Sequence, residues 1–182
     1  NNTAVGQAAL AFNTTADNNT AVGRLAMFCN TTGEQNTASG INSLSSNTTG
    51  GINVANGAYV LCANTTGNDN TAIGGYSMKE NTTGSTNVAM GRSSLRCNTT
   101  ASNNTAVGNA ALCLNTTGCE NVAMGAKALD ANTTGHYNTA VGYDSLSSNT
   151  TASYNTAVGC NALKVNTTGA TNTAVGSNSL DA

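Results

Sequence analysis

Apolar and polar positions recur along this chain with a strict period of seventeen residues. A short run of the form Asn-x-Ala-x-Gly is followed by one large apolar residue and then by Asn-Thr-Thr, and the spacing never changes. Internal repeats of this kind decide the architecture of a protein. The period predicts that residues 1–182 form a single repeat array, which we interpret as a window of a longer chain. The eleven repeats begin at Asn2, Asn19, Asn36, Asn53, Asn70, Asn87, Asn104, Asn121, Asn138, Asn155 and Asn172.

Within the repeat, numbered from this Asn as position 1, the consensus is N-T-A-V-G-x-x-A/S-L-x-x-N-T-T-G-x-x. No apolar spacing of 3.6 residues is present, so the pattern does not predict helices. The β-branched residues at positions 2 and 4 favour a strand, and the invariant Gly at position 5 indicates a corner with positive φ or close backbone approach. Asn-Thr-Thr-Gly is typical of a turn. We therefore expect two strands of four or five residues and two turns in each repeat.

The large apolar residue at position 9 is Leu in nine repeats and Met in two. No other large side chain is kept in every repeat, so we predict that this row fills the interior of the array. The predicted core residues are Leu10, Met27, Leu44, Leu61, Met78, Leu95, Leu112, Leu129, Leu146, Leu163 and Leu180.

A seventeen-residue unit is too short for a helical repeat but long enough for one turn of a coil that stacks on the next at the strand spacing of about 4.8 Å. The predicted fold class is an all-β, parallel β-solenoid or β-roll of about eleven coils, either trimeric or part of a longer fibre. The absence of Pro agrees with this fold, because interior strands must donate hydrogen bonds to their neighbours. Stacking would also align the Asn residues of positions 1 and 12 into ladders of side-chain amides, each donating to the next coil.

Charge and reactive residues are sparse. Charged residues make up 8% of the chain and the net charge is -2, which offers no footprint for nucleic acid, and no apolar run is long enough for a membrane span. The single His, His136, has no second His with which to build a metal site, and the carboxylates do not recur as pairs. The six Cys occupy unmatched positions, so we expect mainly free thiols. We expect no enzymatic activity and no cofactor.

The repeats resemble those of known fibrous proteins. Residues 104–112, Asn-Thr-Ala-Val-Gly-Asn-Ala-Ala-Leu, followed by Asn-Thr-Thr-Gly at 115–118, are similar to the repeats of phage tail-fibre and adhesin-like proteins. The Asn-x-Ala-Val-Gly core also resembles the β-roll head repeats of trimeric autotransporter adhesins. The resemblance implies a structural or adhesive fibre segment that is extracellular, on a cell surface or attached to a virion. It further implies self-association as a homotrimer or helical filament, with position 4 facing partner chains, and cell-surface glycans as ligands.

Two other functions remain open from the sequence. Asn-Thr-Thr is an acceptor motif for N-glycosylation, so the chain is alternatively a glycosylated extracellular filament, although stacking at about 4.8 Å leaves little room for adjacent sugars. The Thr rows at positions 2, 13 and 14 suggest ice binding as a second alternative. The candidate acceptors are Asn13, Asn30, Asn47, Asn64, Asn81, Asn98, Asn115, Asn132, Asn149 and Asn166.

Variation among the repeats is greatest at positions 6, 7, 10, 11, 16 and 17, where recognition can change without disturbing the stacking. All five Tyr residues lie at these positions, and their rings are suited to stack on sugars or to anchor partners. They are Tyr59, Tyr76, Tyr137, Tyr143 and Tyr154.

Overall fold

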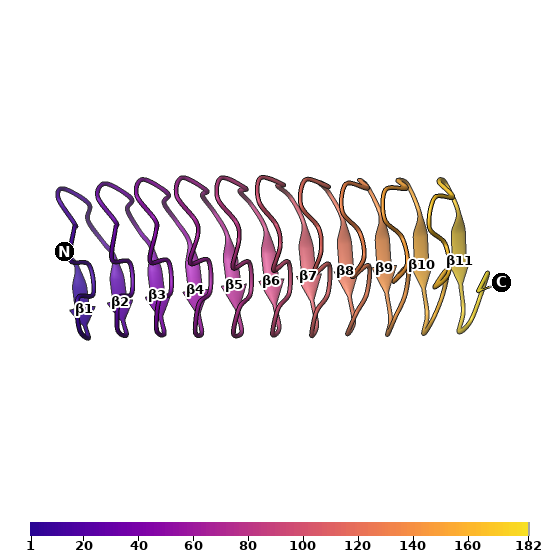
Figure 1. The fold of residues 1–182 in the computed structure, drawn as a ribbon, viewed down its shortest axis with the longest axis horizontal. Helices are drawn as coiled ribbons and strands as arrows, with labels where there is room; N and C mark the ends of the chain where they lie inside the picture. The colour runs from indigo at the N-terminus through magenta and orange to yellow at the C-terminus, as the bar shows by residue number, and fades with distance from the viewer. Residues whose placement is uncertain (182) are drawn as a thin grey trace.

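The computed structural model describes residues 1–181 and shows a rod of stacked coils, with the two ends of the chain at opposite ends of the rod (Figure 1). Every coil contributes one strand to an eleven-stranded sheet whose order follows the sequence. All neighbouring strands are parallel and pair position by position, so that Ala4 lies opposite Ala21 and Ala157 opposite Ala174. The chain is therefore a parallel β-solenoid with seventeen-residue coils. The strands are β1 (Thr3–Val5), β2 (Thr20–Val22), β3 (Thr37–Ser39), β4 (Val54–Asn56), β5 (Thr71–Ile73), β6 (Val88–Met90), β7 (Thr105–Val107), β8 (Val122–Met124), β9 (Thr139–Val141), β10 (Thr156–Val158) and β11 (Thr173–Val175).

The prediction of two strands per repeat is wrong, because each coil has one strand of three residues and the rest of the coil is turns. The turns nevertheless bond to the neighbouring coils as a strand would. The N–H of Asn42 donates to the carbonyl of Arg24 in the preceding coil at 3.0 Å, and the N–H of Leu44 donates to Val60 in the following coil at 3.0 Å. Stacking is thus stabilised around most of the perimeter of each coil, and not only at the sheet.

The turns depend on backbone conformations that the sequence did not reveal. The residues at positions 7, 9 and 17 adopt φ between 47° and 64° in every described coil, although none of them is Gly. The core residue Leu95, for example, has φ 48°. Non-glycine residues in this left-handed region cost on the order of 1 kcal/mol each or more. The inter-coil hydrogen bonds and the buried Leu row offset this cost.

Ile52 offers a test of that cost, because it is β-branched, lies at φ 59° and is 56% exposed. Asn tolerates the left-handed region better than a β-branched residue does and already occupies the same position at Asn18 and Asn103. We expect Ile52→Asn to raise the free energy of unfolding by about 1 kcal/mol, measured by urea denaturation. The reverse substitution Asn103→Ile should lower it by a similar amount, and equal stability of the two variants would contradict the strain argument.

The interior of the rod is filled by the Ala of position 3 and the residues of positions 8 and 9. The prediction for position 9 is confirmed from Met27 to Leu163, all of which are buried. The two end members differ. Leu10 is half-buried, and Leu180 is 60% exposed because no described coil covers it.

The predicted corner at position 5 is also confirmed. The Gly residues of this row have φ between 111° and 138°. A Cβ on Gly91 would lie 2.4 Å from the carbonyl oxygen of Gly108 in the next coil. Both the conformation and the close approach of the backbones therefore require Gly here.

Candidate functional surfaces

The Asn residues of position 12 form a continuous ladder inside the rod. The Nδ2 of Asn47 donates to Oδ1 of Asn30 in the preceding coil at 2.8 Å and to the carbonyl of Gly50 in its own coil at 2.8 Å. Both amide hydrogens are thereby used, and the same pair of bonds recurs along the array. The predicted asparagine ladder exists, but its side chains donate toward the preceding coil and not, as expected, toward the next one.

The Asn residues of position 1 form a second ladder that works differently. The backbone N–H of Asn53 donates to Oδ1 of Asn36 in the preceding coil at 2.9 Å, and its Nδ2 donates to the carbonyl of Gly67 at 2.9 Å. That carbonyl also accepts a bond from Asn64 of position 12 at 3.0 Å. The two ladders therefore meet at position 15, which joins the two ends of each coil.

The burial of the Asn residues of position 12 decides whether they can be glycosylated. The eight position-12 residues from Asn30 to Asn149 are 0% exposed, and a glycan would have to replace a bonded Nδ2 hydrogen. A row of sugars along position 12 is therefore incompatible with the folded rod. Asn13 and Asn166, near the two ends, are only half-buried, while Asn18 and Asn103 are exposed acceptors outside the ladder.

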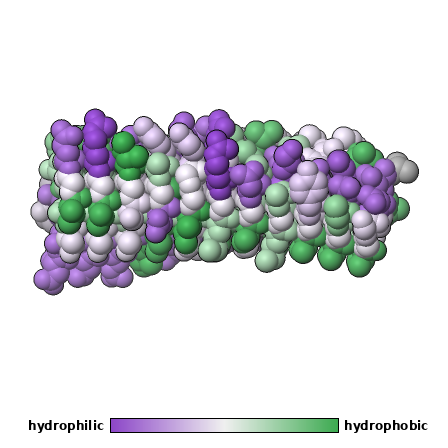
Figure 2. All heavy atoms as spheres, turned by 90° about the horizontal axis from the view of Figure 1, so that it is seen from below, coloured by the Kyte–Doolittle hydropathy of each residue, from purple (hydrophilic) through white to green (hydrophobic). Residues whose placement is uncertain are grey.

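The outer side of the sheet forms one longitudinal surface, which we call the sheet face and define as positions 2 and 4. These positions carry no charged residue in any repeat. Figure 2 shows the resulting row of apolar side chains along the rod, bordered by side chains of near-neutral hydropathy. The exposed apolar residues of position 4 are Val5, Val22, Ile73, Met90, Met124, Val158 and Val175.

The three Thr rows lie in different environments. The hydroxyl of Thr65 at position 13 donates to the carbonyl of Thr82 in the following coil at 3.0 Å, and this bond recurs from Thr14 to Thr150. Thr66 and the other residues of position 14 are exposed. Because the hydroxyls of position 13 are occupied by the backbone, positions 13 and 14 do not form a double row of free hydroxyls.

A second longitudinal surface, the turn face, consists of positions 6, 7, 10 and 11. Tyr59 and Tyr76 of position 7 stack here with parallel rings and centroids 5.5 Å apart. Tyr137 and Tyr154 of position 17 form a similar pair at 5.0 Å. Stacking along the rod covers one face of each ring, so that only the outer face of each pair remains available to a ligand.

Two groups of charged side chains lie on the turn face, and Arg24 lies apart from both. Lys164 forms an ion pair with Asp144 at 3.2 Å, which raises the pKa of Lys164. Burial raises the pKa of the nearby Asp130 carboxyl, and the negative charge of Asp144 raises it further. The second group is cationic and lies in the coils that contain β5 and β6, where Lys79, Arg92 and Arg96 line a common hollow.

The thiols and the imidazole show no activated arrangement. All six thiols are unpaired, and burial raises the pKa of Cys62, Cys97 and Cys113 and so opposes thiolate formation. The Nδ1 of His136 accepts a hydrogen bond from the N–H of Cys119 at 3.0 Å. Residues 1–181 bring no three His, Cys, Asp or Glu side chains together as metal ligands. No helix long and apolar enough to cross a membrane occurs in the same residues.

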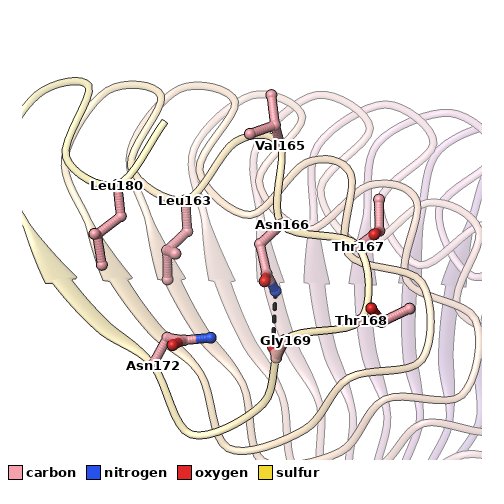
Figure 3. A pocket seen from close by; sticks show the side chains of 8 residues that line it. All are labelled: Leu163, Val165, Asn166, Thr167, Thr168, Gly169, Asn172 and Leu180. Atoms are coloured by element: carbon pink, nitrogen blue, oxygen red, sulfur yellow. Dashed lines mark hydrogen bonds between the residues drawn. The ribbon is translucent and has the colours of Figure 1, made fainter. Parts of the chain in front are cut away.

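A hollow of about 330 Å³ lies at the C-terminal end of the rod (Figure 3). Leu163 and Leu180 point into it from neighbouring coils, and Asn166 donates to the carbonyl of Gly169 beside it. These are the core and ladder positions that every interior coil covers with the next coil. The hollow is therefore the open stacking surface of the last coils and not a separate ligand site.

Comparisons of the chain with protein-family models, with curated proteins and with solved structures give no match.

Proposed function

We propose that this chain is a non-enzymatic segment of an extracellular, surface-bound or virion-attached fibre, in which the stacked coils form a shaft and the variable positions carry adhesion. The supporting observation is the pair of buried Asn ladders. They bond each coil to the preceding one and close each coil at position 15, and they repeat in the same way along the rod. Such an array can be extended by further coils without any new interaction.

The sheet face is the surface through which copies of this chain associate. Its apolar row is exposed over most of the rod and carries no charge that would repel a second copy. Because position 4 repeats at every coil, a second rod with the same period can place its own row against it along the whole contact. Exposed apolar patches of this extent mark interaction sites in soluble proteins. The occupant is therefore a second copy, in a homotrimer or a filament.

This assembly makes a specific prediction for Ile73 and Met90, which are adjacent exposed members of the row. Asn56 shows that the coil accepts Asn at the same position. We expect the double substitution Ile73→Asn/Met90→Asn to shift the chain toward the monomer and to weaken association at least about tenfold, because apolar area is lost from the contact. Light scattering after size-exclusion chromatography measures the mass.

The matched control removes two apolar residues from another surface. Leu114 and Val165 are exposed at position 11, where Ser46 and Ser148 show that Ser is accepted. Leu114→Ser/Val165→Ser should leave the mass of the assembly unchanged. A monomeric wild-type chain, or equal weakening by both double variants, would refute assembly through the sheet face.

The sheet face supports ice binding less well than it supports self-association. An ice-binding array needs a regular lattice of side chains, and the row at position 4 is interrupted by Ser39, Asn56 and the longer Met90 and Met124. Together with the occupied hydroxyls of position 13, this irregularity favours contacts with protein over contacts with an ordered water lattice.

A further inference from the structure

The turn face has a hollow of about 260 Å³ over the coils of β5 and β6. Its lining consists of five side chains that come from positions 6, 7 and 10 of two adjacent coils. They are Tyr76, Lys79, Arg92, Ser93 and Arg96. Three of the six Lys and Arg residues of the whole chain thus surround one small depression.

These three cations have no carboxylate partner among residues 1–181, where the only ion pairs are those of Asp17 with the N-terminus and Asp144 with Lys164. The carboxylate of Glu80, which follows Lys79 in the chain, does not line the hollow. Three like charges that line one hollow and form no ion pair repel one another. An anion placed between them relieves this repulsion and gains charge-assisted hydrogen bonds.

One aromatic side chain, Tyr76, lines the hollow. Tyr76 stacks with Tyr59 on one side, while the next residue of the same row is the small Ser93. The stack therefore ends at Tyr76, and its free ring face is turned toward the hollow that both Tyr76 and Ser93 line. A flat ring face packs well against the apolar C–H face of a ligand, and the Ser hydroxyl both donates and accepts hydrogen bonds.

We propose that this hollow, formed by Tyr76, Lys79, Arg92, Ser93 and Arg96, binds an acidic sugar unit of a polysaccharide, with its sulfate or carboxylate group between the cations and its ring against Tyr76. The inference deepens the adhesive part of the proposed function and does not depend on self-association. The site spans two coils, which suits one or two anionic groups. A nucleic acid would need a longer basic track to follow its backbone, and the remaining Lys and Arg residues, Arg24, Lys127 and Lys164, lie two or more coils away in a chain of net charge -2.

The test measures binding by isothermal titration calorimetry with a heparin oligosaccharide, a hyaluronan oligosaccharide, neutral dextran, single-stranded DNA and inorganic sulfate. The site variant is Arg92→Gln/Arg96→Ser, whose new residues already occur at the same positions in Gln7 and Ser45. The control is Arg24→Gln/Lys127→Ser, which removes two charges elsewhere on the turn face. We expect the site variant to lose at least about tenfold in affinity for an acidic oligosaccharide, and the control to change less than about twofold.

A third variant distinguishes an acidic sugar from a free inorganic anion as the ligand. Tyr76→Ser copies the residue found at Ser93 in the same row. This variant should weaken the binding of the acidic oligosaccharide by about threefold or more and leave the binding of inorganic sulfate unchanged. Circular dichroism of each variant checks that the rod is intact.

Equal losses in the two double variants, tighter binding of single-stranded DNA than of either acidic oligosaccharide, or no binding of both acidic probes would overturn the proposal. Binding of inorganic sulfate with no preference for the oligosaccharides would overturn it as well. The assembly measured by light scattering is a separate readout, so failure of the site and failure of the fibre are distinguishable.

Discussion

Gly108→Ala is expected to disrupt the rod at the coil of β7 and to lower the free energy of unfolding by more than about 4 kcal/mol. The added Cβ would lie 2.5 Å from the carbonyl oxygen of Gly125 and 2.6 Å from its carbonyl carbon. Both atoms belong to the backbone of the next coil, so relief requires the coils to separate. Separation would break the bond from the N–H of Gly125 to the carbonyl of Val107, now 2.8 Å. The φ of 137° adds strain for any residue with a Cβ.

Two glycines of the same chain separate these effects. Gly176 has φ 123° but no atom within 4 Å of an added Cβ, so Gly176→Ala keeps the strain without the clash. Gly75 has neither the strained φ nor the clash, because its φ is not in the positive range and the nearest atom to an added Cβ, the carbonyl oxygen of Ala58, is 3.9 Å away. We expect losses in the order Gly108→Ala, Gly176→Ala, Gly75→Ala, with the last close to zero.

The measurement for this series is urea denaturation combined with amide hydrogen exchange. Repeat arrays unfold by coils and not always as one unit, so exchange of the amides of β6, β7 and β8 reports where the rod opens. A Gly108→Ala rod with wild-type protection in these strands would contradict the close packing of the Gly row.

The sequence predicted the features that repeat identically in every coil. The period, the buried apolar residue of position 9, the glycine corner at position 5 and the presence of the Asn ladder all follow from residues that hardly vary, because identical stacked positions must satisfy the same steric limit in each coil. The single short strand of each coil could not be predicted from the sequence. Leu, Tyr and Ile give no sign of a left-handed φ, which tertiary hydrogen bonding imposes against their local preference.

The surfaces were harder to predict than the interior. Lys79 and Arg96 share position 10 of adjacent repeats, but only the turn geometry brings Arg92 of position 6 into the same hollow. The sequence places all five Tyr residues at variable positions. The stacking of four of them, which hides one face of each stacked ring, depends on two adjacent coils carrying Tyr in one row. The direction of hydrogen bonding in the ladder likewise depends on side-chain rotation that a repeat pattern does not encode.

Asn98→Asp is the second substitution with a large expected effect, because it leaves the shape of the ladder intact and removes its donors. The Nδ2 of Asn98 donates to Oδ1 of Asn81 at 2.7 Å and to the carbonyl of Ala101 at 3.0 Å. A carboxylate would place a negatively charged acceptor against both oxygens in a fully buried position. Only the bond received from Asn115 remains favourable. We expect a loss of about 3–5 kcal/mol at pH 7, the usual cost of an uncompensated buried charge.

The loss of stability caused by Asn98→Asp should become smaller as the pH falls. Burial and the two facing oxygens raise the pKa of the introduced carboxyl in the folded rod above its unfolded value of about 3.9. The folded state then binds more protons than the unfolded state between these two values, so the stability of the variant relative to wild type rises as the pH falls through the folded pKa. A protonated Asp regains one donor for the ladder. Urea denaturation of both chains between pH 4 and pH 8 measures the difference.

Thr100→Asp provides the matched control, since it adds the same charge to an exposed side chain two residues further along the same coil. Its cost should be within about 0.5 kcal/mol, as for other surface substitutions, and nearly independent of pH. If Asn98→Asp were as stable as Thr100→Asp at pH 7, the hydrogen bonds of position 12 would not stabilise the stack. A large loss that did not shrink at low pH would instead assign the effect to packing, because only the missing donor and the buried charge respond to protonation.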